Sequence, residues 1–386
     1  MSRLVDQAAE LLSRLVSCPS VNPGRGAPAG PPFGEAAMAD LLADLLSGWG
    51  AETRKAEIAP GRFNLIARFE GADPGRSLML EAHADTVSVA GMTIDPFVPV
   101  VRDGRLYGRG SCDCKGPMAA MLLAIRTVLD EAARPPATVY FVATGDEEVG
   151  AGGARRLMAD GFRVDAAVVG EPTDLAAVCA HKGAYRCRIV TKGRAAHSSD
   201  PSQGVSAIAR MARVVEAIDG PLARELRRTR HPALGSPTVS VGVICGGRQV
   251  NIVPDRCEIE VDRRTLPGET PDGVERQFRD HLDVLRAADP ALEYALEALE
   301  WLPAFEESPD GPLARRVGGA CEKVLGRAEF KGVPWTANVG IFRQAGIPCL
   351  LFGPGSIRQA HTADEYVELD QVARAAAVYA EILRRF

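Results

Sequence analysis

The sequence has no apolar stretch long enough to cross a bilayer, and its first twenty residues, MSRLVDQAAELLSRLVSCPS, form an amphipathic helical pattern with charges throughout. These features exclude a membrane span and a secretory signal, so we expect a cytoplasmic protein. Lysine and arginine are dispersed in a chain of net charge -5, which argues against nucleic-acid binding. The nine cysteines are odd in number and irregularly spaced, which indicates reduced thiols rather than a disulfide framework.

The length of 386 residues favours two domains, or one domain with a large insertion. Between Leu65 and Glu171, short apolar runs alternate with helical patterns. This alternation predicts an α/β domain with a mostly parallel sheet and helices on both faces. From about residue 180 to 302 the pattern reads β-α-β-β-α-β, the ferredoxin-like arrangement, which predicts an inserted α+β domain. Residues 1–179 and 303–386 then form the first, catalytic domain.

Polar clusters stand where the strands of the first domain are expected to end. They are HAD at residues 83–85, GDEE at 145–148 and GEP at 170–172. In open α/β sheets the ligand lies beyond the carboxyl ends of the strands. These clusters therefore mark the candidate site.

His83 and Asp85 are two residues apart, so on an extended strand they point to the same face. The Asp85 carboxylate can then accept a proton from one imidazole nitrogen and leave the other free for a metal. Taken alone, such a pair is more often a hydrogen-bonded core or turn feature than a metal ligand.

In YGRGSCDCKG, residues 107–116, Asp113 precedes a predicted helix and is either a metal ligand or a helix N-cap. Cys112 and Cys114 have no further cysteine or histidine close in sequence with which to build a thiolate zinc site. We interpret both as small buried side chains.

Glu171 and His361 each follow a glycine-containing strand end and complete a set of two histidines and at least three carboxylates. Such mixed sites suit Zn²⁺, Co²⁺ or Mn²⁺. The adjacent Glu147 and Glu148 diverge at their strand end, so one can bind a metal while the other acts as a base.

With these motifs the sequence resembles the cocatalytic zinc amidohydrolases and peptidases, a family that includes acetylornithine deacetylase, succinyl-diaminopimelate desuccinylase, glutamate carboxypeptidase and aminoacylase. The resemblance runs over nearly the whole chain. The motifs that carry it are HADT, GRGSCDCKG, TGDEEVG, GEPT, HKG, AHSSDPSQGVSAI, NIVPDRCEIEVDRRTLPGET and GPGSIRQAHTADEY.

The resemblance implies a zinc-peptidase-like catalytic domain that binds two divalent ions, with Zn²⁺ preferred and Co²⁺ or Mn²⁺ as alternatives. It also implies a role for each site residue: His83 and Glu171 bind one ion, Glu148 and His361 bind the other, Asp113 bridges them, Asp85 orients His83, and Glu147 is the general base.

For the inserted domain, the resemblance implies a lid that also forms the interface of a homodimer. His197 would reach the active site of the opposite subunit and help to stabilise the oxyanion. Asn251 and Arg264 would bind the substrate, and Arg264 would pair with its carboxylate; a solvated strand arginine is the alternative reading of Arg264.

The implied reaction is metal-dependent hydrolysis of the amide of an N-acyl amino acid, and the GPGSIRQAH and DEY motifs are most similar to the acetylornithine deacetylase type. A succinyl-diaminopimelate desuccinylase, a dipeptidase or carboxypeptidase, and a non-catalytic binding relative are the alternatives. The chain departs from the acetylornithine deacetylase pattern at Ala337, Asn338, Cys114 and Glu171.

Overall fold

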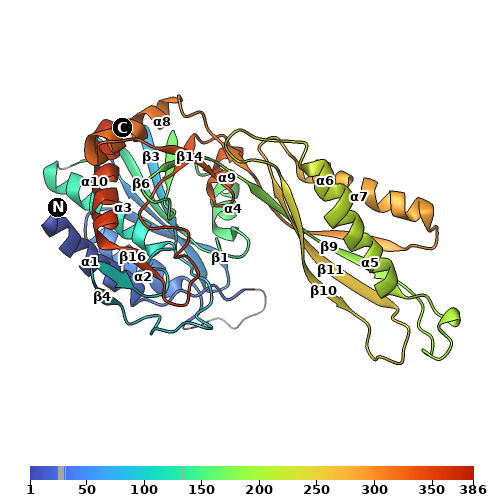
Figure 1. Ribbon diagram of the computed structural model, residues 1–386. Coiled ribbons are helices and arrows are strands. Elements are labelled where there is room, and N and C mark those ends of the chain that lie inside the picture. The colour runs from blue at the N-terminus through green and yellow to red at the C-terminus, as the bar shows by residue number, and fades with distance from the viewer. Residues whose placement is uncertain (25–29, 31, 133) are drawn as a thin grey trace. The chain divides into compact units, whose positions relative to one another are not determined.

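The computed structural model describes residues 1–24, 30, 32–132 and 134–386 (Figure 1). The chain divides into two compact units. The first comprises Met1–Cys179, Glu307–Lys331 and Ala337–Phe386, and the second comprises Ala180–Glu306 and Gly332–Thr336. The predicted insertion, residues 180–302, lies within the range of the second unit.

The first unit is built around a long mixed sheet. Its order is β1-β2-β6-β3-β7-β15-β8-β13, and β14 also pairs with β8. The strands are β1 (Glu52–Ala59), β2 (Arg62–Phe69), β3 (Asp73–His83), β6 (Ala137–Thr144), β7 (Ala166–Val169), β8 (Ala177–His181), β13 (Phe305–Glu306), β14 (Phe330–Val333) and β15 (Cys349–Leu351).

The parallel strands β6, β3, β7 and β15 occupy the middle of this sheet, and antiparallel strands flank them. The buried strands consist largely of Val, Leu and Ala, as expected where helices cover both faces. Their register aligns His83 with Thr144, and Val169 with both Glu81 and Leu351. The carboxyl ends of the central strands therefore meet at one edge. The predicted α/β class is confirmed.

Helices lie on both faces of the sheet. In Figure 1, α1, α3 and α10 lie on one side, and α4 and α9 lie on the other. The helices of this unit are α1 (Ser2–Val16), α2 (Ala36–Ser47), α3 (Lys115–Glu131), α4 (Gly152–Ala159), α8 (Pro312–Leu325), α9 (Val339–Gln344) and α10 (Leu369–Arg385).

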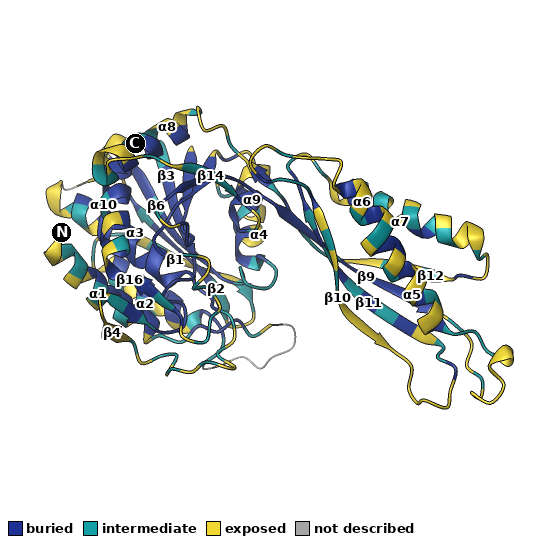
Figure 2. Ribbon diagram, viewed as in Figure 1, coloured by how far each residue is buried: buried dark blue, intermediate teal, exposed yellow. Residues whose placement is uncertain are grey.

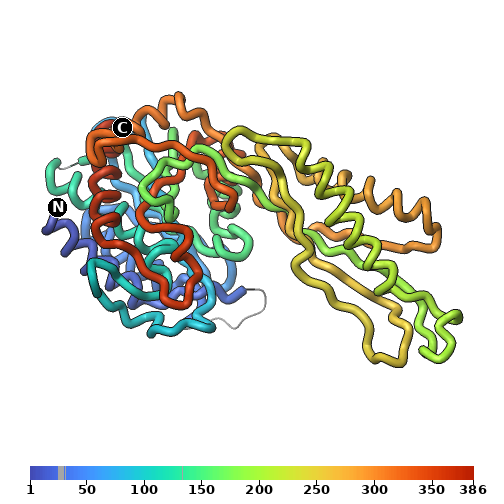
Figure 3. Tube along the Cα trace, viewed as in Figure 1, coloured from blue at the N-terminus to red at the C-terminus, as the bar shows by residue number. Residues whose placement is uncertain are grey.

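Helices from distant parts of the chain pack together in the first unit. The red C-terminal helix in Figure 3 packs along the α3 segment, more than two hundred positions earlier in sequence. α1 is held by one apolar face, where Ala8, Leu11, Leu12 and Leu15 are buried at helical spacing. A small sheet, β16 (Tyr366–Glu368), β5 (Arg105–Tyr107) and β4 (Val100–Arg102), ties the residues after His361 to the loop that carries Asp113.

The second unit has the predicted β-α-β-β-α-β connectivity. Its sheet is antiparallel with the order β10-β11-β9-β12. Its elements are β9 (Gly183–Lys192), η1 (Pro201–Gln203), α5 (Ala207–Ala217), η2 (Ile218–Leu222), α6 (Ala223–Leu226), β10 (Thr238–Gly246), β11 (Arg256–Thr265), α7 (Pro271–Ala288) and β12 (Tyr294–Leu302).

Strand β11 alternates buried and partly buried residues, so one face of this sheet packs on the helices. Ser206 caps α5, because its side chain accepts a hydrogen bond from the amide of Ala209. Thr270 caps α7, which has Pro271 in its first turn. Figure 2 shows buried residues along β9 and β11 and exposed residues along β10.

All nine cysteines lie in the described part of the chain, and each is a free thiol. Among the helices of the described residues, none is long and apolar enough to cross a membrane.

Candidate metal centre

The candidate ligands come together at the carboxyl edge of the central parallel strands. His83 is the last residue of β3, Glu148 follows the end of β6, and Glu171 follows the end of β7. Asp113 precedes α3, and His361 lies in the segment after β15. The adjoining strands thus deliver side chains that are far apart in sequence to one place.

Two groups of potential ligand atoms share Asp113. One comprises His83, Asp113, Cys114 and Glu171, and the other comprises Asp113, Glu148 and His361; within each group the atoms lie within 4.8 Å of one another. His83 Nε2 is 2.9 Å from Asp113 Oδ1, and His361 Nε2 is 3.3 Å from Asp113 Oδ2. Each oxygen of Asp113 therefore faces a different histidine, which is the arrangement that a bridging carboxylate needs.

His361 adopts a backbone conformation that is unusual for a side chain of its size, with φ of 63°. Its Nε2 lies 3.2 Å from Glu148 Oε2, and half of its side chain is exposed. A strained backbone at a residue that contacts two acids points to a functional position. His83, in contrast, is almost completely buried.

Asp113 is not the N-cap of α3, which was the alternative reading of this residue. The capping position belongs to Cys114, and its side chain makes no capping hydrogen bond. The peptide bond between Asp113 and Cys114 is cis. The Asp113 carboxylate instead faces His83 and His361.

Asp85 organises the site through a different contact from the one predicted. His83 Nδ1 is 2.8 Å from the backbone carbonyl of Asp85 and 3.7 Å from its carboxylate Oδ1. This differs from the expected carboxylate contact because β3 ends at His83, so Asp85 is no longer on an extended strand. The carboxylate accepts hydrogen bonds from the backbone amides of Glu147 and Glu148, at 3.0 and 3.1 Å. Asp85 therefore joins the end of β3 to the loop that carries both glutamates.

Asn22 is a buried residue that the sequence did not single out. Its Nδ2 donates to Asp85 Oδ2 at 2.7 Å and to Asp146 Oδ1 at 3.1 Å. Asp146 has a positive φ of 65° and also receives a hydrogen bond from Arg62. Asn22 carried no sequence signal because its partners are distant along the chain.

Glu365 is a second buried residue that the sequence did not single out. One oxygen of its carboxylate accepts the amides of Cys112 and Asp113 at 2.9 and 3.0 Å. The other accepts the amide of Gly110 at 2.9 Å and Arg109 Nη1 at 2.8 Å. Glu365 thus fixes the loop that presents Asp113. Its only sequence signal is its place in the DEY motif after His361.

The carboxylates of the site disfavour one another's ionisation. Burial raises the pKa of Glu147 and that of Glu171 well above the usual range for glutamate, and the charge of Asp113 adds to both shifts. Burial also raises the pKa of Glu148. Hydrogen bonds to Asp113 and Glu148 raise the pKa of His361 to about 10. Acids crowded in this way gain from a neighbouring cation.

The three candidate substrate contacts lie in the second unit. His197 and Asn251 are neighbours, since the amide of Ser198 donates to the carbonyl of Asn251 at 3.0 Å and His197 forms a bridge with Ile252. Arg264 lies near the other end of the same sheet. Its guanidinium is held by Asp262 Oδ1 at 2.7 Å and Thr336 Oγ1 at 3.2 Å.

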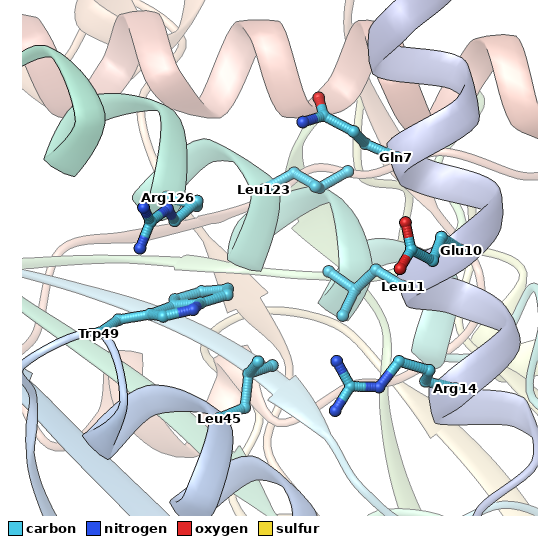
Figure 4. A pocket seen from close by; sticks show the side chains of 8 residues that line it. All are labelled: Gln7, Glu10, Leu11, Arg14, Leu45, Trp49, Leu123 and Arg126. Carbon is cyan, nitrogen blue, oxygen red and sulfur yellow. The ribbon is translucent and has the colours of Figure 1, made fainter.

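A separate hollow of about 140 Å³ lies in the first unit, where α1, α3 and the end of α2 meet (Figure 4). The Arg126 guanidinium is 5.9 Å from the centre of the Trp49 ring at its wall. Among the described residues, none that lines this hollow belongs to either of the two ligand groups. Its lining consists of Gln7, Glu10, Leu11, Arg14, Leu45, Trp49, Leu123 and Arg126.

Comparisons with known proteins find relatives over most of the chain. Residues 79–385 match the model of peptidase family M20/M25/M40. The acetylornithine deacetylase of Proteus mirabilis is 32% identical over 385 residues, which cover 98% of this chain and 96% of that protein.

Solved structures share the fold. Aminopeptidase PepT from Bacillus cereus has a TM-score of 0.80 at 22% identity, with 98% of each chain covered. The dinuclear metal binding peptidase YXEP from Bacillus subtilis has a TM-score of 0.75 at 17% identity, with 100% of this chain and 99% of that chain covered.

Proposed function

Because this chain belongs to peptidase family M20/M25/M40, we propose that it uses two divalent metal ions in its first unit to hydrolyse the amide bond of an N-acyl amino acid. Membership confirms the family resemblance of the sequence motifs, and the chain is a hydrolytic enzyme. The observation that carries the two-metal proposal is the position of Asp113, which belongs to both groups of potential ligands.

The donor atoms suit two metal ions. Imidazole and carboxylate together favour Zn²⁺, Co²⁺ or Mn²⁺, and we propose Zn²⁺. Glu148 Oε1 is buried and has no hydrogen-bond partner among the described residues, which fits an oxygen directed at an ion. His83 and Glu171 would hold one ion, Glu148 and His361 would hold the other, and Asp113 would lie between them.

Glu147 is the proposed general base. Its backbone is held by Asp85, and it lies close enough to His83 and Asp113 for their charges to influence its pKa. When bound, the ions supply Lewis-acid activation of water and of the scissile carbonyl. Glu147 accepts the proton from the attacking water and returns it to the leaving amine.

The second unit supplies the proposed substrate contacts. Arg264 offers a guanidinium to the carboxylate of the amino-acid part of the substrate, and its contacts with Asp262 and Thr336 hold it ready for this role. Asn251 would hydrogen-bond to the substrate, and His197 would stabilise the oxyanion.

We propose that these contacts require a homodimer. On β11, Arg264 is paired with Ala184 and Arg256 with Lys192, and the His197 loop begins just beyond Lys192. Eight residues of strand span roughly 26 Å. A small substrate can therefore contact both Arg264 and His197 only if they come from different chains.

The edge of the second unit supports this association. β10 ends the sheet, and its exposed Val243 and Ile244 present apolar side chains beside backbone groups that can pair with another strand. Ile208, Val250 and Ile252 are also exposed apolar side chains of this unit. A second copy of the chain could cover this surface across a two-fold axis.

The substrate class follows from the curated relatives, of which several are acetylornithine deacetylases. N-acetylornithine is the proposed substrate. N-succinyl-diaminopimelate and small dipeptides are the alternatives for the same site, because each places an amide next to a free carboxylate.

A substrate panel tests the proposal. Zinc-loaded and cobalt-loaded protein should release free amine from N-acetylornithine faster than from N-succinyl-diaminopimelate or dipeptides, and Glu147→Gln should not release it. Preferred turnover of another compound would reassign the substrate. Failure to hydrolyse the whole panel, with metal bound, would favour a non-catalytic binding protein.

A further inference from the structure

Cys114 directly follows the residue that belongs to both ligand groups. Its side chain is fully buried, and its Sγ lies within 4.8 Å of ligand atoms of His83, Asp113 and Glu171. The sequence does not predict this, because no cysteine or histidine beyond Cys112 lies close to Cys114 along the chain. The fold supplies the partners instead, from the ends of β3 and β7.

We propose that Cys114 is a thiolate ligand of the metal ion that His83, Asp113 and Glu171 hold, which rests on the two-metal site proposed above. The thiol proton leaves to solvent as the sulfur–metal bond forms. Zn²⁺ accepts nitrogen, oxygen and sulfur ligands, and it can expand from four to five ligands, so an ion held by these four residues can still bind water. The four residues supply one imidazole, one sulfur and two carboxylates.

The neighbouring Cys112 provides an internal comparison. It is also fully buried, but its Sγ faces the carbonyl of Ser356 at 3.3 Å and belongs to neither ligand group. Cys114 Sγ is 2.6 Å from the carbonyl of Gly170, the residue next to Glu171. In the metal-free protein the thiol donates this hydrogen bond and lies beside the strand end that presents Glu171, and the proposed sulfur–metal bond would replace it.

A thiolate makes the two metal positions chemically different. Cys114 gives the His83 position a soft donor, whereas Glu148, His361 and Asp113 offer the other position only nitrogen and oxygen. Soft donors favour Zn²⁺ over harder ions such as Mn²⁺. The His83 position should therefore retain zinc against Mn²⁺ more strongly than the His361 position does.

X-ray absorption at the zinc edge tests the ligand set in the wild-type protein. Protein with two zinc ions per chain should show a sulfur scatterer at about 2.3 Å from zinc, beside nitrogen and oxygen at about 2.0–2.2 Å. Because only one of the two ions binds sulfur, the fitted coordination number should be half a sulfur per zinc. Cys112→Ser, the matched control, should keep this sulfur signal. Cys114→Ser should lose it and bind one of its two zinc ions at least about tenfold more weakly.

Cobalt gives a second measurement that needs no variant. Titration of metal-free wild-type protein with Co²⁺ should produce a thiolate-to-cobalt charge-transfer absorption that saturates at one equivalent per chain. Two bound ions with neither a sulfur scatterer nor this absorption would overturn the Cys114 assignment and leave the two-metal site standing. A protein that binds no zinc or cobalt would overturn both.

Discussion

Replacing Glu365 by glutamine should destabilise the loop that presents Asp113. The two oxygens of the Glu365 carboxylate each accept two hydrogen bonds, from Arg109 and Gly110 on one side and from Cys112 and Asp113 on the other. A glutamine amide turns one of these acceptors into a donor. The side-chain amide of glutamine can take two orientations. In each of them, the two donors on one side face its NH₂ group and lose their acceptor.

The cost can be judged from these contacts. A hydrogen bond to a charged group contributes about 1.5–3 kcal/mol, and two are lost. Arg109 is 2% exposed and would lose its carboxylate partner, a change that typically costs about 3–5 kcal/mol when the pair is buried. These effects overlap, because Arg109 is one of the two donors when the NH₂ group faces Arg109 and Gly110. We therefore expect a loss of about 3–5 kcal/mol in the stability of the first unit.

Glu368→Gln is the matched control. Glu368 lies three residues further along and pairs with Arg105 at 2.8 Å, but both side chains are more than a third exposed. An exposed pair contributes about 0–1 kcal/mol.

Urea unfolding of the metal-free proteins measures both changes, and hydrogen exchange of the segment from residue 108 to 114 shows whether the loss is local. A Glu365→Gln protein within 1 kcal/mol of wild type, with unchanged exchange in this segment, would refute the reasoning.

Three further predictions concern the site. Glu147→Gln should lower kcat about 10²–10⁴-fold while metal content, measured by plasma mass spectrometry, stays at the wild-type level; an unchanged kcat would assign the base to another residue. Asp85→Ala removes the acceptor for the amides of Glu147 and Glu148 and should weaken metal binding about 10–100-fold in a chelator competition, whereas unaltered affinity would mean that the loop holds its position without Asp85. Glu147→Gln and His197→Ala chains, each nearly inactive alone, should regain activity on subunit exchange; inactive heterodimers would show that His197 does not act across the interface.

The sequence predicts the fold and the candidate site where a periodic pattern of apolar residues ends in residues that can bind a metal. The alternation of apolar runs predicted the α/β sheet, and the strand ends predicted where His83, Glu148 and Glu171 would gather. The sequence also predicts the β-α-β-β-α-β order of the second unit, because the apolar residues of each helix and strand repeat at the spacing typical of that element.

The sequence does not predict contacts between segments that are distant along the chain. Asn22 and Glu365 look like ordinary loop residues until the fold brings Asp85 and the residues around Asp113 to them. The sequence predicts only a packing role for Cys114, because its neighbours in the fold come from the ends of two strands distant in sequence. The exact contact of His83 depended on where β3 ends, which the alternation of residues does not fix.

Anomalous diffraction from crystals of the zinc-loaded protein tests the two-metal centre most directly. Data collected at the zinc edge should show two peaks per chain, about 3.5–4 Å apart, on either side of the Asp113 carboxylate. One peak should lie between His83 and Glu171, and the other between Glu148 and His361. A single peak, or peaks away from Asp113, would contradict the account.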